Sequence, residues 1–251
     1  MRRLAGTAEL LDGPLDDPVA LAGNLRDLRR INRWLGGVEL SRRALAALVG
    51  RRSGMVSFLD VGTGAADIPL ALARSAGGEG HPPLSITAID SRPEVIEAAR
   101  RLDPGVRDAE GLRLAVGDGQ ALSASNGSHD VVHASLVLHH LQPDEAVRFL
   151  AEMRRVARVG VIVNDLSRSR LGWIGAWLLG RLATRNRLTR HDAPLSVLRA
   201  YTPSEMKGLM ARAGLRPVYI AYAFLRHRYA IAAVTSVPTE SRVAAALETG
   251  P

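Results

Sequence analysis

Two adjacent histidines, His139 and His140, lie in a stretch from His129 to Leu141 that is expected to be a strand leading to the carboxyl edge of a sheet. Imidazole titrates near neutral pH, so either ring could remove a proton from a phenol or from an activated carbon. One of the two is expected to be structural, and we favour His139 as the base. His191, in a basic run further along the chain, is a third candidate for this chemistry.

A glycine-containing turn follows an earlier apolar strand. Asp60, Gly62 and Gly64 come directly after that strand, and helical apolar spacing begins at Ile68. The two glycines allow a positive φ and a close approach of the backbone to a ligand. The pattern predicts a strand, a cofactor-binding turn and a helix. A turn that only joins the strand to the helix is the alternative, because a lone pair of glycines is weakly specific.

The sequence from Asp60 through Gly64 resembles the first motif of the class I S-adenosylmethionine-dependent methyltransferases. Three later segments are similar to that family and occur in the same order: Asp90 after a second strand, Gly117 to Leu122 after a third, and Val137 to Leu141 after a fourth. The last of these resembles small-molecule methyltransferases that act on quinone and polyketide rings. The resemblance covers residues 55–234. It implies S-adenosyl-L-methionine as the cofactor and S-adenosyl-L-homocysteine as its product.

The resemblance also implies roles for individual side chains. Asp90, at a strand end, is expected to accept hydrogen bonds from both ribose hydroxyls. Asp118 is expected to accept from the adenine amino group, and Ser135 to lie beside the methyl group. The complete set of expected cofactor-binding residues is Asp60, Gly62, Thr63, Gly64, Asp67, Asp90, Ser91, Asp118, Gly119, Gln120 and Ser135.

Charge separates this turn from a dinucleotide-binding turn. The Gly-x-Gly-x-x-Gly pattern of such turns places a third glycine where this chain has Asp67. A carboxylate there would repel a pyrophosphate, whereas the sulfonium and amino group of S-adenosylmethionine are positive. The chain departs from the methyltransferase pattern in one place, since Ala66 stands where that family usually has a third glycine.

A lid is predicted over residues 166–200. The segment from Leu171 to Leu179 is apolar on nearly every side and too short to span a bilayer, and the basic run from Arg181 to His191 follows it. We expect an apolar lining for a hydrophobic substrate, with a dimer contact and a membrane-surface helix as the open alternatives. The expected substrate-binding residues are Asn32, Asp165, Trp173, Trp177, Arg190 and Arg199.

The composition limits other functions. The chain of 251 residues contains no cysteine, which excludes disulfides, thiolate metal sites and methyl transfer through a cysteine nucleophile. The sequence does not require a metal. Its first residues are typical of neither a signal peptide nor a membrane span, so a cytoplasmic location is expected. The net charge of +8 is carried almost entirely by arginine, with Lys207 as the only lysine.

The order of elements predicts an α/β fold. We expect a Rossmann-like seven-stranded sheet, mostly parallel with one antiparallel strand, and helices on both faces. Residues 1–50 are expected to form an N-terminal helical cap, residues 51–235 the methyltransferase domain with its lid insertion, and residues 236–251 a mobile tail.

The predicted reaction is methyl transfer from S-adenosylmethionine to an oxygen or carbon of a hydrophobic phenolic, quinone or polyketide-type small molecule. An RNA methyltransferase is the rival suggested by the arginines, but the chain has no Asn-Pro-Pro-Tyr type motif and no appended RNA-binding module. A non-catalytic domain that binds the cofactor or a partner is the third alternative. Homo-oligomerisation is left open.

Overall fold

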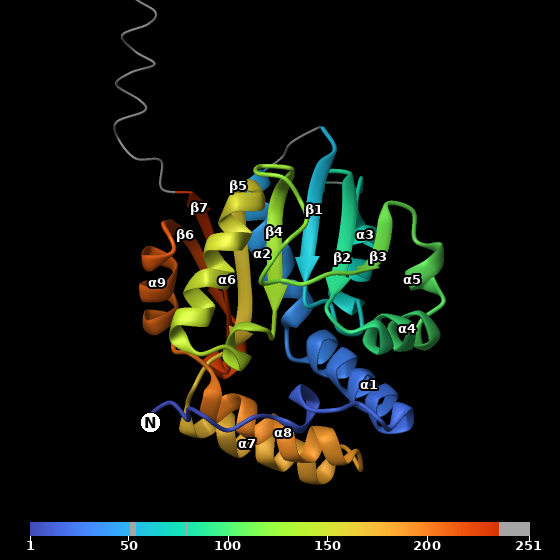
Figure 1. Ribbon diagram of the computed structural model, residues 1–251, viewed down its shortest axis with the longest axis vertical. Coiled ribbons are helices and arrows are strands. Elements are labelled where there is room, and N and C mark those ends of the chain that lie inside the picture. Colours follow the sequence, from blue (N-terminus) through green and yellow to red (C-terminus); the bar gives the residue numbers. More distant parts are fainter. Residues whose placement is uncertain (51–53, 79, 236–251) are drawn as a thin grey trace, which may run out of the picture.

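The computed structural model describes residues 1–50, 54–78 and 80–235, so the predicted mobile tail lies outside the described residues. Seven strands form one sheet in the order β3-β2-β1-β4-β5-β7-β6 (Figure 1). Their bounds are β1 Val56–Val61, β2 Leu84–Asp90, β3 Leu112–Val116, β4 His129–Ser135, β5 Ala157–Leu166, β6 Leu215–Tyr222 and β7 Arg228–Thr235. Only β7 runs antiparallel to its neighbours in this sheet. The predicted α/β fold with one antiparallel strand is therefore confirmed.

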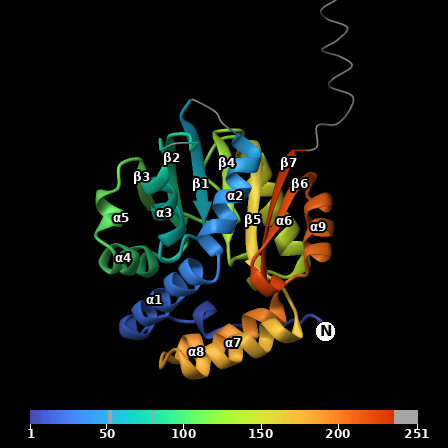
Figure 2. The ribbon, with the colours of Figure 1, turned by 180° about the vertical axis from the view of Figure 1, so that it is seen from behind.

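Helices cover both faces of the sheet. The α-helices are α1 Pro18–Trp34, α2 Gly37–Val49, α3 Asp67–Ser75, α4 Pro93–Leu102, α5 Gly105–Asp108, α6 Pro143–Val156, α7 Arg170–Leu182, α8 Arg187–Arg199 and α9 Pro203–Arg212, and the short 3₁₀ turns are η1 Leu10–Asp12, η2 Leu138–His140 and η3 Phe224–Arg226. Helices α6 and α9 pack on one face, and α2 and α3 pack on the opposite face (Figures 1 and 2).

Strand β1 shows how the two apolar layers arise from sequence. Side chains alternate between the faces of a strand, so Phe58 packs against α2 and α3, while Leu59 packs against α6. Both side chains are buried. A parallel strand covered on both faces needs a continuous apolar run, which explains why this stretch does not alternate with polar residues.

Helix α2 belongs to the packing of the sheet. Its residues Leu40, Ala44 and Leu45 are buried in the same cluster as Phe58 of β1 and Ile162 of β5. The boundary predicted at residue 50 thus separates α2 from the sheet that it covers. We propose that the N-terminal cap ends at Gly36, where φ is 84° and the chain turns between α1 and α2.

Helices α1, α7 and α8 lie together beyond the carboxyl ends of the parallel strands, at the lower edge of the sheet in Figure 1. Side-chain caps fix where they begin: Asp17 accepts from two amides of α1, Ser169 from one of α7, and Asn186 from two of α8. The first residues of the chain run alongside α8, so a third segment closes this end of the sheet.

None of the helices among residues 1–50, 54–78 and 80–235 combines the length and the apolar character that crossing a membrane requires.

Candidate active site

The glycine turn adopts the backbone that its sequence predicts. Gly62 has a φ of 73° and Gly64 a φ of 53°, and the amides of Gly62 and Thr63 both donate to the carbonyl of Ile89 on the neighbouring strand. A Cβ on Gly62 would lie 2.5 Å from a methyl group of Val137. Ala66 also has a positive φ, of 54°, which gives a physical reason for the glycine that related sequences carry there.

Replacing Gly62 by alanine is expected to weaken S-adenosylhomocysteine binding at least tenfold, because the new methyl group both strains the left-handed backbone and displaces Val137. Calorimetric titration would measure this loss. Gly77→Ala is the matched control, since Gly77 has a φ of 71° but open space around its Cβ position. An equal loss of cofactor affinity in both variants would contradict the account of the turn.

Two acidic residues lie at adjacent strand ends of this edge. At the end of β2, Asp90 accepts a hydrogen bond from the amide of Gly64 at 3.1 Å and another from Arg92. Burial raises the pKa of Asp90 above its usual value, while these two hydrogen bonds oppose that rise. Asp118 is exposed after β3 and accepts from the amide of Gln120 at 2.8 Å. Asp90 therefore lies beside the glycine turn, and Asp118 lies one strand further along the same edge of the sheet.

The first acidic residue of the motif lies deeper than the sequence predicts. Asp60 is buried and accepts a 2.5 Å hydrogen bond from Nδ1 of His133, its register partner on β4. Nε2 of His133 lies 2.8 Å from the hydroxyl of Ser41 on α2. Through His133, Asp60 is thus linked to β4 and to helix α2, and it lies behind the turn. His133 was missed because its role depends on the register between strands.

A buried polar network extends from Ser41 to Asp67, the first residue of α3. Its centre is Arg228, which is fully buried and donates hydrogen bonds to Asn164, Asn32 and Ser135. Asn164 also donates to the hydroxyl of Ser41. Burial lowers the pKa of Arg228 to about 10, and nearby carboxylates oppose that change, so the guanidinium remains charged at neutral pH. Ser135, predicted beside the methyl group, accepts one of these hydrogen bonds.

Asp67 forms the other end of this network. Its Oδ1 accepts from Asn32 at 3.2 Å, and its Oδ2 is buried without a hydrogen-bond partner among the described residues. Burial raises the pKa of Asp67 to about 6, although Asn32 and Arg228 act in the opposite direction. A buried acceptor beside the glycine turn suits a ligand that brings a positive amino group.

The pKa of Asp67 makes stability depend on pH. Because the folded-state value is above the unfolded one, protonated Asp67 favours folding below about pH 4, and this contribution is lost as the pH rises through 6. Asp67→Asn should therefore gain about 2 kcal/mol relative to the wild type between pH 4.5 and 7.5. Urea unfolding at both pH values measures it. Asp16→Asn, at an exposed site, is the control, and a difference that is the same at both pH values would contradict the assignment.

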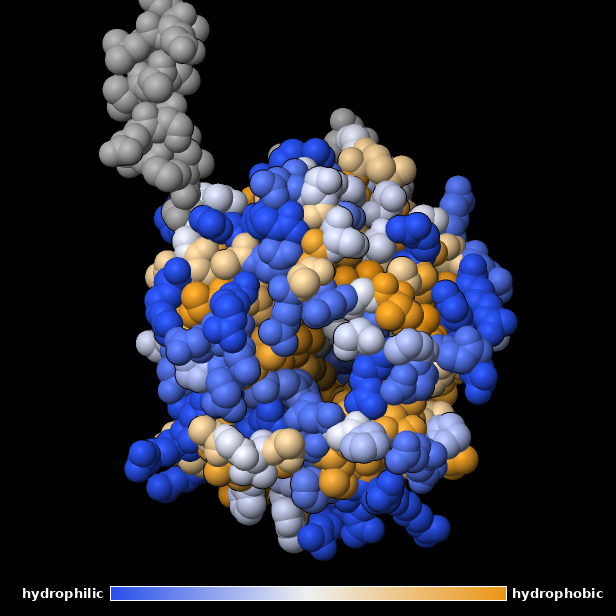
Figure 3. All heavy atoms as spheres, in the orientation of Figure 1, coloured by the Kyte–Doolittle hydropathy of each residue, from blue (hydrophilic) through white to orange (hydrophobic). Residues whose placement is uncertain are grey.

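A cavity of about 830 Å³ lies between the sheet edge and the surrounding helices. Most of its wall is apolar and comes from α1, α7, α8 and the β6–β7 connection, including Leu28, Ile31, Leu171, Ala176, Leu179, Val197 and Phe224. Figure 3 shows a hollow on the drawn face, between the sheet and the lower helices, with apolar atoms in its depth. A cavity of this size and lining fits a mainly hydrophobic small molecule.

Residues 136–140 connect the glycine turn to this cavity. Val137 packs against Gly62, whereas Leu136, His139 and His140 line the cavity. Leu136 has a φ of 57°, a strained value for leucine, and its amide donates to the carbonyl of Asn164. A ligand against the turn and a ligand in the cavity would thus meet at this segment.

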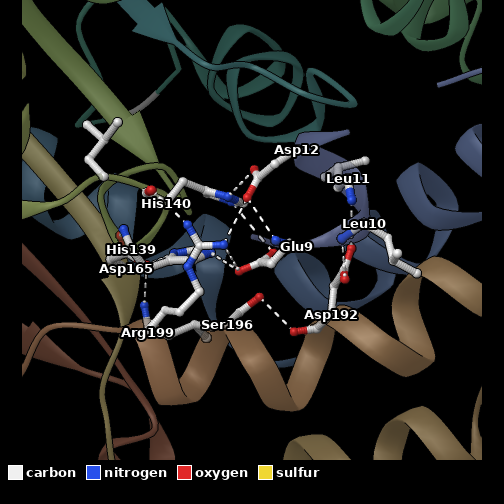
Figure 4. A network of polar contacts seen from close by, with 12 residues as sticks. Glu9, Leu10, Leu11, Asp12, His139, His140, Asp165, Asp192, Ser196 and Arg199 are labelled. Atoms are coloured by element: carbon white, nitrogen blue, oxygen red, sulfur yellow. Dashed lines mark hydrogen bonds and ion pairs between the residues drawn. The ribbon is translucent and has the colours of Figure 1, made fainter. Parts of the chain in front are cut away.

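Both adjacent histidines have a carboxylate behind them (Figure 4). Nδ1 of His139 donates to Asp165 at 2.7 Å, and Nδ1 of His140 donates to Asp12 at the same distance. Carboxylates only accept, so each Nδ1 carries a proton and Nε2 is the ring atom left for other chemistry. Burial alone would raise the pKa of Asp165, but the contacts with His139 outweigh it and lower that pKa.

Glu9 faces the two histidines from the N-terminal segment. Its Oε1 lies 3.8 Å from Nε2 of His139, and its Oε2 lies 3.9 Å from Nε2 of His140. Burial raises the pKa of Glu9 to about 7. Asp192 on α8 accepts from the amides of Leu10 and Leu11 and so holds this segment against the cavity (Figure 4).

The lid residues differ most from the prediction. Helix α7 faces the cavity with Leu171, Gly172, Gly175, Ala176 and Leu179, while Trp173 and Trp177 are not part of the cavity wall. Trp177 is 41% exposed, and the guanidinium of Arg181 lies 5.3 Å from the centre of its ring. The helical repeat places residues 173 and 177 on another side of α7. Neither tryptophan lines this cavity, so their contact with substrate stays a prediction.

Four further candidates lie outside the cavity wall. Asp165 and Asn32 are buried behind it, bonded to His139 and to Arg228. Arg190 and His191 are exposed on α8, and His191 is bonded to Asp192 instead of facing the cavity. These positions do not bring them to a substrate in this conformation.

Arg199 lies behind the cavity wall and contacts residues next to the two histidines. It is buried, donates to Asp12 at 2.8 Å and to the carbonyl of His140 at 2.7 Å, and is not part of the cavity wall. It thereby ties α8 to η1 and η2.

Comparison with known proteins identifies the class. Residues 58–160 match the family described as "Methyltransferase domain". No curated protein matches the chain in sequence. The domain match covers the glycine turn and the segment with both histidines, and with the fold it defines an S-adenosylmethionine-dependent methyltransferase. The cofactor is therefore S-adenosyl-L-methionine.

Solved structures share the fold at low sequence identity. An S-adenosylmethionine-dependent methyltransferase from Aquifex aeolicus is 18% identical with a TM-score of 0.59, and the match covers 86% of this chain and 97% of that one. The Haloferax volcanii methyltransferase in complex with the activator Trm112 is 15% identical with a TM-score of 0.60, covering 90% and 100%. An O-methyltransferase family 2 protein from Planctomyces limnophilus, in complex with apigenin, is 20% identical with a TM-score of 0.56, covering 85% and 61%.

Proposed function

We propose that this methyltransferase transfers the methyl group to an oxygen or carbon of a hydrophobic phenolic, quinone or polyketide-type small molecule held in the 830 Å³ cavity. The observation that carries the proposal is the segment 136–140, which touches Gly62 of the cofactor turn on one side and lines the cavity on the other. Among the structural neighbours, mitomycin 7-O-methyltransferase and the apigenin complex favour the same class of acceptor.

His139 is the proposed general base. Its Nε2 is the imidazole atom free to take a proton from an acceptor, because Nδ1 is bonded to Asp165. As the acceptor atom bonds to the methyl carbon, the carbon–sulfur bond breaks and the sulfonium becomes a neutral thioether. Base assistance of this kind contributes about 10²–10⁴-fold to the rate. Asp165 is a positioning residue that fixes the tautomer and ring orientation of His139.

The apolar wall supports this reaction in two ways. It excludes water, which strengthens the effect of the few polar groups on the reacting atoms. It also orients a flat, hydrophobic acceptor by its shape. The cavity contains no aromatic-basic groove that would favour a nucleic-acid chain, since the wall from α1, α7 and α8 is mainly aliphatic in the part of the chain that the structure describes.

Turnover tests the proposal directly. Wild-type protein with methyl-labelled S-adenosylmethionine should transfer label to at least one member of a panel of phenols, hydroxyquinones and polyketide-like aromatics. Transfer to structured RNA but to none of these acceptors would contradict the proposal. Saturable cofactor binding with no transfer to any acceptor would favour a non-catalytic role.

A further inference from the structure

Three ligand-type side chains converge on one point of the cavity wall. One ring nitrogen each of His139 and His140 and one carboxylate oxygen of Glu9 lie within 4.8 Å of one another. All three residues line the cavity. They come from two segments that are about 130 positions apart in sequence and are drawn together in Figure 4.

The hydrogen bonds at Nδ1 leave the Nε2 atoms of His139 and His140 facing the carboxylate of Glu9. Asp165 and Asp12 each accept a hydrogen bond from Nδ1 of one imidazole, so the Nε2 atom of each ring is the one that lies near Glu9. The separations of 3.8 and 3.9 Å are too long for hydrogen bonds between them. Oε1 of Glu9 is buried and has no hydrogen-bond partner among the described residues. Such an arrangement lacks a positive centre between its three members.

We propose that Glu9, His139 and His140 bind a divalent transition-metal ion at the cavity wall. Metal bonds of about 2.0–2.2 Å with tetrahedral angles place two ligand atoms about 3.4 Å apart. The spacings of 3.8 and 3.9 Å between Glu9 and the two histidines exceed this value by a few tenths of an ångström, and all three ligand atoms lie within 4.8 Å of one another, so an ion would draw them closer together. Two imidazoles and one carboxylate are a ligand set suited to zinc or ferrous ions.

The surroundings of the imidazoles support this assignment. Histidines that bind metals usually donate the other ring N–H to a carboxylate, which orients the ring and raises its basicity. His139 with Asp165 and His140 with Asp12 both have this arrangement. The positive group close to Glu9 is Arg199, whose Nη1 lies 3.6 Å from Oε1 and 2.8 Å from Asp12. Its single charge opposes the ion, but three carboxylates next to the site outnumber it.

Metal binding at this site is independent of the proposed function, and only the role of the ion in methyl transfer rests on it. The remaining coordination positions face the cavity, where an acceptor hydroxyl could occupy one of them. The ion would lower the pKa of that hydroxyl, and its proton would leave to water, so the coordinated oxygen would attack the methyl carbon. A metal-bound His139 cannot serve as a base, so the base mechanism applies to the metal-free enzyme and the ion replaces it when bound.

Metal binding to the full-length, untagged protein tests the site. After chelator treatment, titration with Zn²⁺ by calorimetry should show one ion per chain, with a dissociation constant in the micromolar range or below. Glu9→Gln and His140→Ala should each weaken binding at least tenfold. His129→Ala is the matched control, because His129 lies at the opposite end of β4, and it should bind as the wild type does. Unchanged affinity for S-adenosylhomocysteine verifies that each variant is folded.

A second measurement uses only the wild type. Anomalous diffraction from crystals grown with Co²⁺ should give a peak between Glu9, His139 and His140. A peak elsewhere, no saturable one-to-one binding, or binding that Glu9→Gln leaves unchanged would each overturn the proposal. Methyl transfer to a phenol without metal binding would contradict the proposed metal site but not the proposed function. Metal binding at the three residues without methyl transfer to any acceptor would contradict the proposed function but not the metal site.

Discussion

Replacing His139 by alanine in metal-free enzyme is expected to lower kcat by about 10²–10⁴-fold, the usual contribution of a general base. The ring lines the cavity, and its Nδ1 is bonded to the buried carboxylate of Asp165, so Nε2 is the atom available to the acceptor. Steady-state rates with a chelator present measure the effect. KM for S-adenosylmethionine should change little, because the glycine turn is on the other side of Val137.

Two companion variants separate catalysis from folding. His129→Ala removes an imidazole at the far end of β4 and should keep the wild-type rate. Asp165→Asn should lower kcat less than His139→Ala does and should change the pH profile, since it removes the acceptor that holds the proton on Nδ1. A His139→Ala enzyme with wild-type kcat would exclude His139 as the base.

Arg228→Ala is expected to destabilise the fold by about 3 kcal/mol. The substitution leaves a cavity and deprives Asn164, Asn32 and Ser135 of their shared donor inside the protein. It also removes a positive charge close to the buried carboxylates of Asp67 and Asp165. The free energy of unfolding from urea titration at pH 7.5 measures the loss.

Arg226→Ala is the matched control two residues away. Arg226 is exposed and lies 3.9 Å from the centre of the Tyr222 ring, so its loss should change stability by less than about 1 kcal/mol. A similar effect for the two arginines would mean that the network around Arg228 contributes little, and the account of this edge of the sheet would be wrong.

The sheet and its first turn could be predicted because local patterns determine them. The apolar run before Asp60, the two glycines and the helical spacing after them specify strand, turn and helix without reference to distant residues. The start of α9 is a similar case, since Thr202 accepts from the amide of Glu205 in a Thr-x-x-Glu pattern typical of helix starts.

Contacts between distant segments could not be predicted in this way. Nothing local indicates that Glu9 and Asp12 meet His139 and His140, because that contact depends on how the N-terminal segment packs on α8. The partnership of Asp60 with His133 likewise requires the register between β1 and β4. Sequence showed the residue types that could do chemistry but not which carboxylate stands behind which imidazole.

The lid shows a different limit. The apolar segment from Leu171 to Leu179 was expected to line the substrate site, and its two tryptophans were among the residues expected to bind substrate. Which side of an apolar helix faces inward is decided by its partner, and here Gly180 packs close to Arg190 of α8. Leu171, Ala176 and Leu179 line the cavity, and Trp177 is partly exposed.

The most direct test is a crystal structure with S-adenosylhomocysteine and an active acceptor analogue. We predict the cofactor against Gly62 and Gly64 with its ribose at Asp90, its sulfur directed past Leu136, and the acceptor in the cavity with its reacting atom next to Nε2 of His139. Cofactor density at the turn with the acceptor bound outside the cavity, away from both histidines, would contradict the proposed site of methyl transfer.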